Sequence, residues 1–261
     1  MKMIKKVRVL NLLFCLLIIS ILHLSFSVGS PELIKELTVA SGTSDSAVVT
    51  SSAGSIYDSL QLDMAGLNRK AFNIALNGWE KLNKDGRLAN HDTIGIIDFS
   101  QPSTSKRLFV LDMKNHSLLF NSLVAHGRNS GKKQAVSFSN KASSYKSSPG
   151  FYVTGDTYNG SNGFSLRLNG LESGINDKAL ARGIVMHGAD YVSESFIAGR
   201  GYIGRSQGCP ALPLKDAKDI INTMKGGACL FIYTPDRHYL SRSEILSTEI
   251  LKAGILSFMM V

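Results

Sequence analysis

Cys209 lies in a loop-type segment whose neighbours favour chemistry over packing. The segment reads Arg205-Ser206-Gln207-Gly208-Cys209-Pro210. Gly208 removes a side chain beside the sulfur and allows a substrate to approach the backbone closely, while Pro210 favours an extended conformation at Cys209. Such a thiol is a candidate nucleophile if a base or cation lies beside it, because a free thiol with a pKa of about 8.5 is mostly protonated at neutral pH.

Two of the six histidines are placed to act as that base. His126 and His187 each end an apolar, strand-like run, and a glycine follows each of them. The other histidines lie in the N-terminal leader or in polar, turn-like surroundings: His23, His91, His116 and His238. Without further context, the pattern favours a hydrogen-bonded structural histidine at the end of a strand in both places.

The order of these groups resembles the L,D-transpeptidases, the YkuD-like superfamily of exported bacterial enzymes that remodel peptidoglycan. The general motif of that superfamily is a His, a gap and then Ser/Thr-His-Gly-Cys. Here Gln207 replaces the second His and Pro210 follows the Cys, as in the murein L,D-transpeptidase catalytic-domain-like branch. Further matching motifs fall within about residues 56–236: Ile97-Asp98-Phe99-Ser100, His126-Gly127-Arg128-Asn129-Ser130-Gly131, Phe138-Ser139-Asn140, Ser147-Ser148-Pro149-Gly150 and Gly204-Arg205-Ser206.

The resemblance implies a cysteine transpeptidase that uses neither a metal nor a cofactor. Cys209 would be the nucleophile and His187 its general base, acting on the tetrapeptide stems of peptidoglycan. The thiolate would attack the carbonyl of the third residue and expel the terminal D-Ala, leaving a thioester. An amine of a second stem would then give a 3–3 crosslink, whereas water would give an L,D-carboxypeptidase.

Two glycines have predicted roles beside these groups. The backbone N–H groups of Gly208 and Cys209 are the expected donors to the oxyanion of the tetrahedral intermediate. Gly188 is expected to let a backbone carbonyl orient His187, because no acidic side chain is clearly placed for that role. Asp190, close in the sequence, is the second candidate for orienting the imidazole.

The same motifs predict residues that bind substrate. Arg205 is expected to hold a substrate carboxylate through two parallel hydrogen bonds. Ser206 is expected to bind substrate or to brace its own loop, and Tyr191 to line the cleft or to belong to the core. His126 and Arg128 are predicted to line the pocket.

Hydrophobic periodicity predicts the elements that carry these residues. An apolar stripe with helical spacing follows Asn68, a potential N-cap, and ends near Gly86. A second helix is expected over 217–224. Strand-type runs cover 93–99, 107–113, 117–124, 151–154, 164–168, 183–187 and 228–234. The expected fold is a β-rich α+β domain, an L,D-transpeptidase-like β-sandwich or mixed sheet with a few flanking helices.

The chain divides into four predicted parts. Residues 1–27, with basic residues ahead of an apolar stretch, are typical of a secretory signal peptide, and an uncleaved anchor is the alternative. A Ser/Thr-rich linker follows over 28–55, then the catalytic domain over 56–236 and a possibly helical tail over 237–261. These features predict export to the periplasm or cell envelope of a bacterium, without stable membrane insertion after cleavage.

Charge and the remaining cysteine limit the other function classes. The chain has a net charge of +9 but no dense basic run outside the leader, so we expect peptidoglycan stem peptides and not nucleic acid as partners. Cys229 lies in an apolar strand-type run, which favours two free thiols, although a Cys209–Cys229 disulfide stays open. A non-catalytic wall-binding protein and a thiol redox protein are the competing classes, but the chain has no Cys-x-x-Cys.

Overall fold

The computed structural model describes Gly54 and residues 56–246, and the fold is given for this part of the chain. The predicted signal peptide and, apart from Gly54, the predicted linker lie outside the described residues. So does the end of the predicted tail, from residue 247 onwards. None of the described helices is long and apolar enough to cross a membrane.

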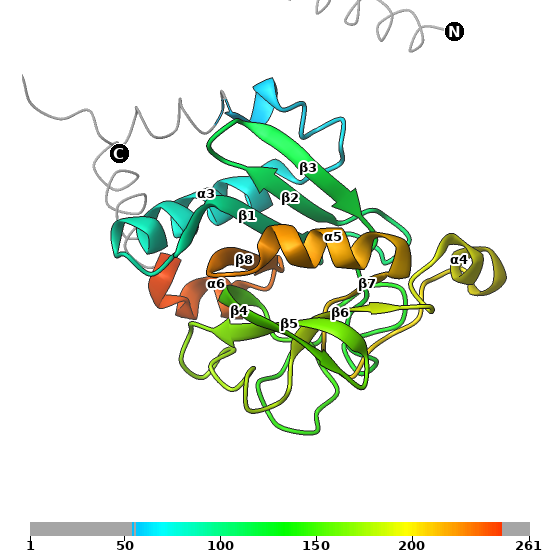
Figure 1. Ribbon diagram of the computed structural model, residues 1–261. Helices are drawn as coiled ribbons and strands as arrows, with labels where there is room; N and C mark the ends of the chain where they lie inside the picture. The colour runs from blue at the N-terminus through cyan, green and yellow to red at the C-terminus, as the bar shows by residue number, and fades with distance from the viewer. Residues whose placement is uncertain (1–53, 55, 247–261) are drawn as a thin grey trace, which may run out of the picture. The chain divides into compact units, whose positions relative to one another are not determined.

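One eight-stranded mixed sheet forms the centre of the domain, in the order β3-β2-β1-β8-β4-β5-β6-β7 (Figure 1). The strands are β1 Asn90–Asp98, β2 Leu108–Asp112, β3 Ser117–Ser122, β4 Gly150–Gly160, β5 Gly163–Gly170, β6 Val185–Ala189, β7 Ala211–Pro213 and β8 Ala228–Tyr233. The β1–β8 and β6–β7 pairs are parallel and the others antiparallel. Strand β8, the last of the described strands, therefore joins β1–β3 to β4–β7.

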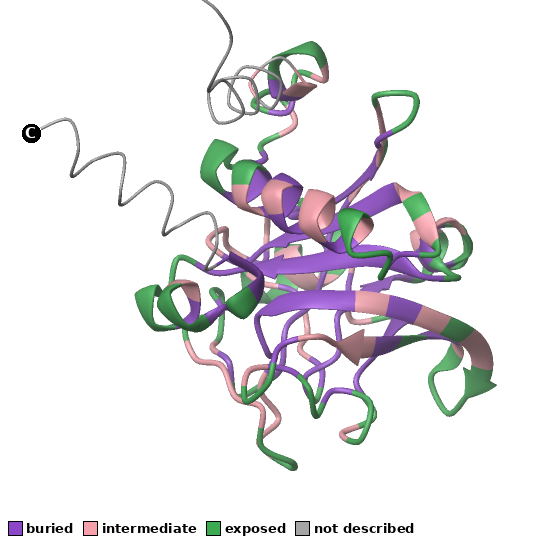
Figure 2. Cartoon of the chain, turned by 90° about the vertical axis from the view of Figure 1, so that its left-hand side faces the viewer, coloured by how far each residue is buried: buried purple, intermediate pink, exposed green. Residues whose placement is uncertain are grey.

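Helices cover both faces of the sheet because side chains alternate along its central strands. Helix α3 (Arg69–Lys84) packs in the same apolar cluster as Ile94 and Ile96 of β1. Helix α5 (Leu214–Met224) packs in another cluster, with Ile97 of β1. Figure 2 shows the strands between these helices as largely buried and the outer helix faces as exposed. The expectation of a β-rich α+β fold with a mixed sheet is confirmed.

The predicted start of α3 is confirmed in detail. The side chain of Asn68 accepts hydrogen bonds from the backbone N–H groups of Lys70 (2.9 Å) and Ala71 (3.2 Å), two of the donors that a helix N-terminus leaves without partners. The helix ends at Lys84, and Gly86, with φ of +67°, lies just beyond it.

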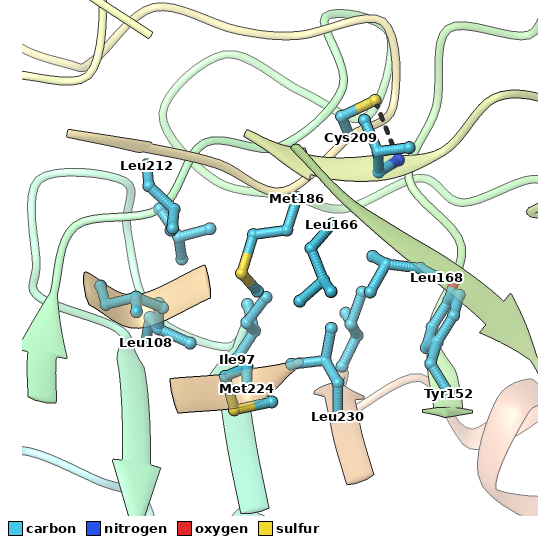
Figure 3. Packing of buried hydrophobic residues seen from close by; sticks show 14 of the residues in the cluster. Ile97, Leu108, Tyr152, Leu166, Leu168, Met186, Cys209, Leu212, Met224 and Leu230 are labelled. Atoms are coloured by element: carbon cyan, nitrogen blue, oxygen red, sulfur yellow. Dashed lines mark hydrogen bonds between the residues drawn. The ribbon is translucent and has the colours of Figure 1, made fainter. Parts of the chain in front are cut away.

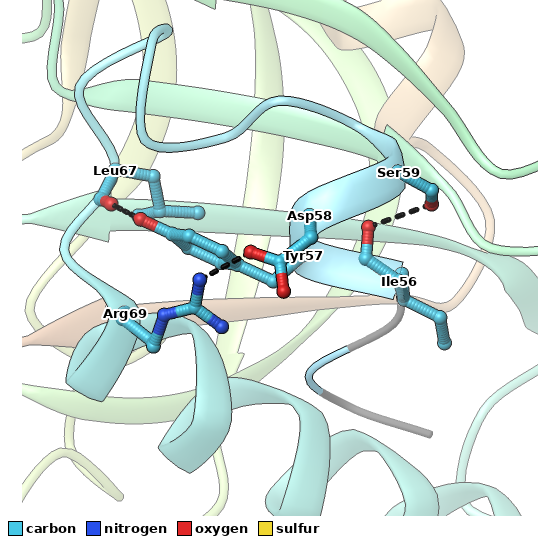
Figure 4. Close-up of polar contacts among 6 residues, drawn as sticks. All are labelled: Ile56, Tyr57, Asp58, Ser59, Leu67 and Arg69. Carbon is cyan, nitrogen blue, oxygen red and sulfur yellow. Dashed lines mark hydrogen bonds and ion pairs between the residues drawn. The ribbon is translucent and has the colours of Figure 1, made fainter. Parts of the chain in front are cut away.

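The segment before α3 is held against the helix by polar contacts (Figure 4). Arg69 forms an ion pair with Asp58, and its guanidinium lies 4.1 Å from the centre of the Tyr57 ring. The Tyr57 hydroxyl donates to the carbonyl of Leu67. Residues 56–67 are thus packed as part of the same unit as the sheet.

Figure 3 shows a cluster of buried apolar side chains from several strands of the sheet, which extends to Cys209. Ile97 of β1 and Leu230 of β8 share this cluster with Leu166 of β5 and Met186 of β6. Cys209 belongs to its edge. Close packing beneath the loop that carries Cys209 gives that loop a rigid base.

The described part of the tail is helical and joins the core. Helix α6 spans Arg237–Arg242, and the hydroxyls of Tyr239 and Ser243 both donate to the buried carboxyl of Glu172. The backbone N–H of Phe151 donates to the same group (2.7 Å). Burial raises the pKa of Glu172, and these hydrogen bonds oppose the rise.

Candidate active site

The loop that carries Cys209 is fixed between two segments from distant parts of the sequence. Cys209 comes two residues before Ala211, which pairs with His187 in the parallel β6–β7 ladder. On the other side, the segment around His126 bonds to the loop through its backbone: Ser206 N–H donates to His126 O (3.0 Å), and Arg128 N–H donates to Ser206 O (2.8 Å). The topology therefore brings Cys209 and His187 to the same edge of the sheet.

Gly208 is required by the shape of this loop. Its φ is +126°, a region that side chains disfavour, and a Cβ there would lie 2.9 Å from the carbonyl oxygen of Lys146. Its N–H donates to Ser206 Oγ (3.0 Å) at rest, and its role as a donor to the oxyanion stays a prediction. The N–H of Cys209 lies beside its own sulfur and lowers the pKa of that thiol.

The sulfur of Cys209 is almost buried, with 9% of the residue exposed. It accepts from the Val185 N–H (3.5 Å, dashed in Figure 3) and donates to the Gly183 carbonyl (3.7 Å). Burial raises the pKa of the thiol, so the resting group is protonated. Among the described residues, no hydrogen bond joins the sulfur to the His187 ring.

His187 lies within β6, two residues before its end, and not at the end of the strand as expected. Its Nδ1 is 2.9 Å from the carbonyl oxygen of Gly188. A carbonyl can only accept, so Nδ1 carries the proton and Nε2 has a free lone pair. Burial lowers the pKa of His187, which keeps the ring neutral and able to take a proton. Asp190 is exposed and lines a different cavity, so Gly188 is the orienting group.

Cys209 and His187 line one cavity of about 600 Å³. Three arginines line it as well, Arg128, Arg182 and Arg205, and among the described residues no carboxylate side chain does. The remaining walls come from the loop at Ser143 and Tyr145, from the β4–β5 hairpin tip at Ser161 and Asn162, and from Gly183, Ile184, Tyr191, Ser206 and Gln207. The cavity therefore favours an anionic ligand.

Two of the predicted substrate-binding residues have donors facing this cavity. Arg205 donates through Nη1 to the carbonyls of Arg128 and Gly131, both at 3.1 Å, which leaves its other N–H groups for a ligand. The guanidinium of Arg128 stacks 3.9 Å from the centre of the Tyr145 ring. Tyr191 also lines the cavity, and burial raises the pKa of its hydroxyl to about 12.

Ser206 braces its own loop. Its hydroxyl accepts from the Gly208 N–H and donates to the Cys209 carbonyl (2.6 Å). Both contacts stay within the loop, so the bracing role is the one that the structure shows, although Ser206 also borders the cavity.

His126 does not line the cavity, contrary to the prediction. It is fully buried; Nδ1 accepts from Arg107 (2.8 Å), and Nε2 donates to the carbonyl of Gly131 (3.2 Å). Burial and the charge of Arg107 lower the pKa of His126 to about 4, so it is neutral. His126 supports the site indirectly, because the Gly131 carbonyl that it holds also accepts a hydrogen bond from Arg205, which lines the cavity.

Several residues of the site were not predicted, and Arg182 and Ser147 are the two with the most contacts to its loops. Arg182 lines the cavity beside Cys209, and the Ser147 hydroxyl accepts from Gly127 N–H (3.0 Å) and donates to Gly208 O (3.1 Å). Ser147 lies in a motif that matched the family, which could have indicated it. Arg182 lies in an ordinary Ala-Arg-Gly sequence, and its place before the strand of His187 was the sole signal.

The remaining cysteine is separate from this chemistry. Cys209 and Cys229 are both free, which confirms the expectation of two thiols. Cys229 lies in the cluster on the α3 face, and burial raises the pKa of its thiol far above the usual range. Within the described part of the chain, no group of three His, Cys, Asp or Glu side chains could hold a metal ion.

Comparisons with known proteins show the family of the chain. A family model described as L,D-transpeptidase catalytic domain matches residues 63–233, more than half of the chain. A comparison with curated proteins gives no match. Among solved structures, an L,D-transpeptidase from Mycobacterium smegmatis is 12% identical, with 55% of this chain aligned to 59% of that one at a TM-score of 0.35.

Two further solved structures are similar at the same level. L,D-transpeptidase 3 from Mycobacterium tuberculosis is 14% identical, with 55% of this chain aligned to 61% of that one at a TM-score of 0.35. An L,D-transpeptidase from Stackebrandtia nassauensis is 15% identical, with 64% of this chain aligned to 68% of that one at a TM-score of 0.34. The match of residues 63–233 to the family model is what identifies the family. The chain therefore belongs to the L,D-transpeptidase catalytic domain family.

Proposed function

We propose that the protein is a cysteine L,D-transpeptidase that acts on the tetrapeptide stems of peptidoglycan and forms 3–3 crosslinks. The observation that carries the proposal is the shared cavity, in which the thiol of Cys209 and the neutral imidazole of His187 lie among three arginines. Family membership supports the same chemistry. Peptidoglycan stems carry several carboxylates, and a cavity lined by guanidinium groups complements them.

In the first step the thiol of Cys209 gives up its hydrogen bond to the Gly183 carbonyl and turns to His187. The S–H proton, which points to the Gly183 carbonyl at rest, passes to Nε2 of His187. The thiolate attacks the carbonyl of the third stem residue, and the C–N bond to D-Ala breaks as the imidazolium returns its proton to the leaving amine. An acceptor amine then attacks the thioester and gives its proton to Nε2 of His187 as the new amide forms and the C–S bond breaks. The imidazolium returns that proton to the Cys209 thiolate and restores the resting thiol.

Hydrolysis of the same thioester is the second outcome. Water in place of the acceptor amine converts the tetrapeptide to a tripeptide. The cavity, of about 600 Å³, has room for either water or an acceptor amine. Export to the bacterial envelope belongs to the proposal as well, and the signal-like residues 1–27 support it.

Defined tetrapeptide muropeptides test the proposal directly. The protein without residues 1–27 is incubated with them, and mass spectrometry separates crosslinked dimers, tripeptides and unchanged substrate. Dimers support transpeptidation, and tripeptides alone support the carboxypeptidase. Cys209→Ala should abolish both products, whereas Cys229→Ala should retain them. Unchanged substrate with a folded wild-type protein would refute both activities.

A further inference from the structure

Arg182 lies directly beside the nucleophile loop and is largely taken up by contacts within the protein. Its Nη1 donates to the Ser139 carbonyl (2.8 Å) and to Ser148 Oγ (2.6 Å). Its Nη2 donates to the Lys146 carbonyl (2.6 Å) and to Ser144 Oγ (3.3 Å). All four acceptors belong to one loop, residues 139–148, whose Ser143 and Tyr145 form a wall of the cavity.

Donor counting separates Arg182 from the other arginines of the cavity. A guanidinium has five N–H donors, and the four on the terminal nitrogens of Arg182 all have acceptors in the protein. Arg205 has only Nη1 engaged. Arg205 is therefore free to hold a substrate carboxylate, whereas Arg182 is fixed in one orientation by the loop.

The fixed guanidinium lies close to the nucleophile loop. A Cβ added at Gly208 would lie 2.9 Å from the Lys146 carbonyl and 3.4 Å from Arg182 Nη2. The Lys146 carbonyl, its hydrogen bond from Arg182 and the backbone of Gly208 are thus packed together. Cys209 follows immediately, so a permanent positive charge is held close to the sulfur.

The positive charge of Arg182 acts against the burial of the thiol. Burial raises the pKa of Cys209, and the hydrogen bond from the Val185 N–H and then the charge of Arg182 oppose that rise. Arg182 is affected in turn: burial lowers its pKa, and the Coulombic interactions with Tyr152 and then with Cys209 oppose that fall. His187 is neutral at rest because burial lowers its pKa, so it provides no charge until it has taken the proton.

We propose that Arg182 is a positioning residue with two effects: it fixes the 139–148 loop as a wall of the substrate cavity, and it stabilises the thiolate form of Cys209. The inference rests on the proposed function in naming Cys209 as the nucleophile. In this arrangement Arg182 acts on the nucleophile and its loop, whereas Arg205 and Arg128 bind the substrate.

The pH dependence of alkylation tests the electrostatic effect without a substrate. The protein without residues 1–27, which include Cys15, carries Cys229→Ala as the background, so that iodoacetamide reports on Cys209. We expect Arg182→Gln to raise the midpoint of the rate–pH profile and to lower the rate at neutral pH by about tenfold. Arg182→Lys, which keeps the charge but loses the fork, should shift the midpoint less. Arg87→Gln removes an exposed arginine after α3 and should leave the profile unchanged.

Steady-state kinetics on tetrapeptide substrates tests the loop. Arg182→Lys should raise KM more than it lowers kcat, because the loop loses its two-pronged contact while the charge remains. Arg182→Gln should lower kcat as well. A folded Arg182→Gln protein with the wild-type alkylation profile and KM would overturn the inference; if that variant does not fold, the same result for Arg182→Lys would overturn it.

The two proposals can fail separately. If the wild-type protein turns over no stem peptide, the proposed function fails, while the alkylation profile still measures the effect of Arg182 on the thiol. If the wild-type protein is active and the Arg182 variants match it in both assays, the inference fails and the function stands.

Discussion

The chain contains two His-Gly pairs at the ends of apolar runs, and the structure uses them in opposite ways. His187 lines the cavity with Nε2 free, whereas His126 is fully buried with both ring nitrogens occupied. Arg107, also fully buried, takes the Nδ1 lone pair of His126. The comparison shows that a histidine can act as a general base only if one ring nitrogen keeps a free lone pair. An imidazole with two hydrogen-bonded nitrogens, such as that of His126, has no lone pair to offer.

The largest expected difference between the two histidines is in turnover. His187→Gln should lower kcat on tetrapeptide substrates by about 100- to 10 000-fold, the usual contribution of a positioned general base. The Gln amide can still donate to the Gly188 carbonyl, so the free energy of unfolding should change little. Turnover and urea unfolding measured together test this; a loss of activity that merely follows a loss of folded protein would contradict it.

The second expected difference is in stability. His126→Ala removes one of the two hydrogen bonds of Arg107 Nη2 and one of the two that the Gly131 carbonyl accepts, and should lower the free energy of unfolding by about 1 to 3 kcal/mol. His126→Gln, whose amide has both an acceptor and a donor, is the matched control and should lose less. Equal unfolding midpoints for the wild-type and Ala proteins would show that the buried contacts of His126 contribute nothing.

The titration of His126 predicts how stability depends on pH. Its pKa is about 4 in the folded protein and 6.5 when exposed, so the unfolded chain binds more protons between those values. Stability should therefore fall as the pH drops from about 6.5 to 4, by on the order of 3 kcal/mol, and this contribution should level off below pH 4. Urea unfolding at several pH values measures it, and His126→Gln should flatten the curve.

The smallest expected difference is between the two glycines. A Cβ at Gly127 would lie 2.5 Å from the Tyr145 carbonyl and 3.0 Å from Gly208 Cα, which are both backbone atoms. A Cβ at Gly188 would meet side chains of Ala217 and Leu214 at 3.0 and 3.1 Å. Gly127→Ala should cost about 1–3 kcal/mol and slow Cys209 alkylation, whereas Gly188→Ala should cost less. The reverse order would mean that the Gly127 contact is not what holds the loop.

Much of the fold follows from local periodicity, and the exceptions have local causes. The stripe of α3 and the apolar runs of β1, β2 and β8 are buried on rigid elements, so sequence alone indicates them. The strand predicted over 151–154 continues to Gly160 as β4, because a polar hairpin extends it past an irregularity between Thr154 and Thr157. That extension has little apolar pattern to detect.

The site was predictable only in part, because its residues meet through pairings that the sequence does not encode locally. Cys209 and His187 were found through their motif. Arg182 enters the site through hydrogen bonds to a loop more than thirty residues earlier in the chain. His126 was wrongly predicted to line the cavity, because the sequence does not show that its partner is Arg107, the residue just before β2. Long-range partners of this kind decide whether a polar residue lines a cavity or supports it.

The position of β8 in the sheet governs when the enzyme can assemble. Residues 228–233 are the last strand in the described part of the chain, yet they supply the seam between β1 and β4. Until they emerge from the ribosome, the β1–β3 meander and the β4–β7 portion have no common hydrogen-bonded border. Such long-range closure slows folding. The nucleophile and its base thus gain their full sheet support only after β8 has been made.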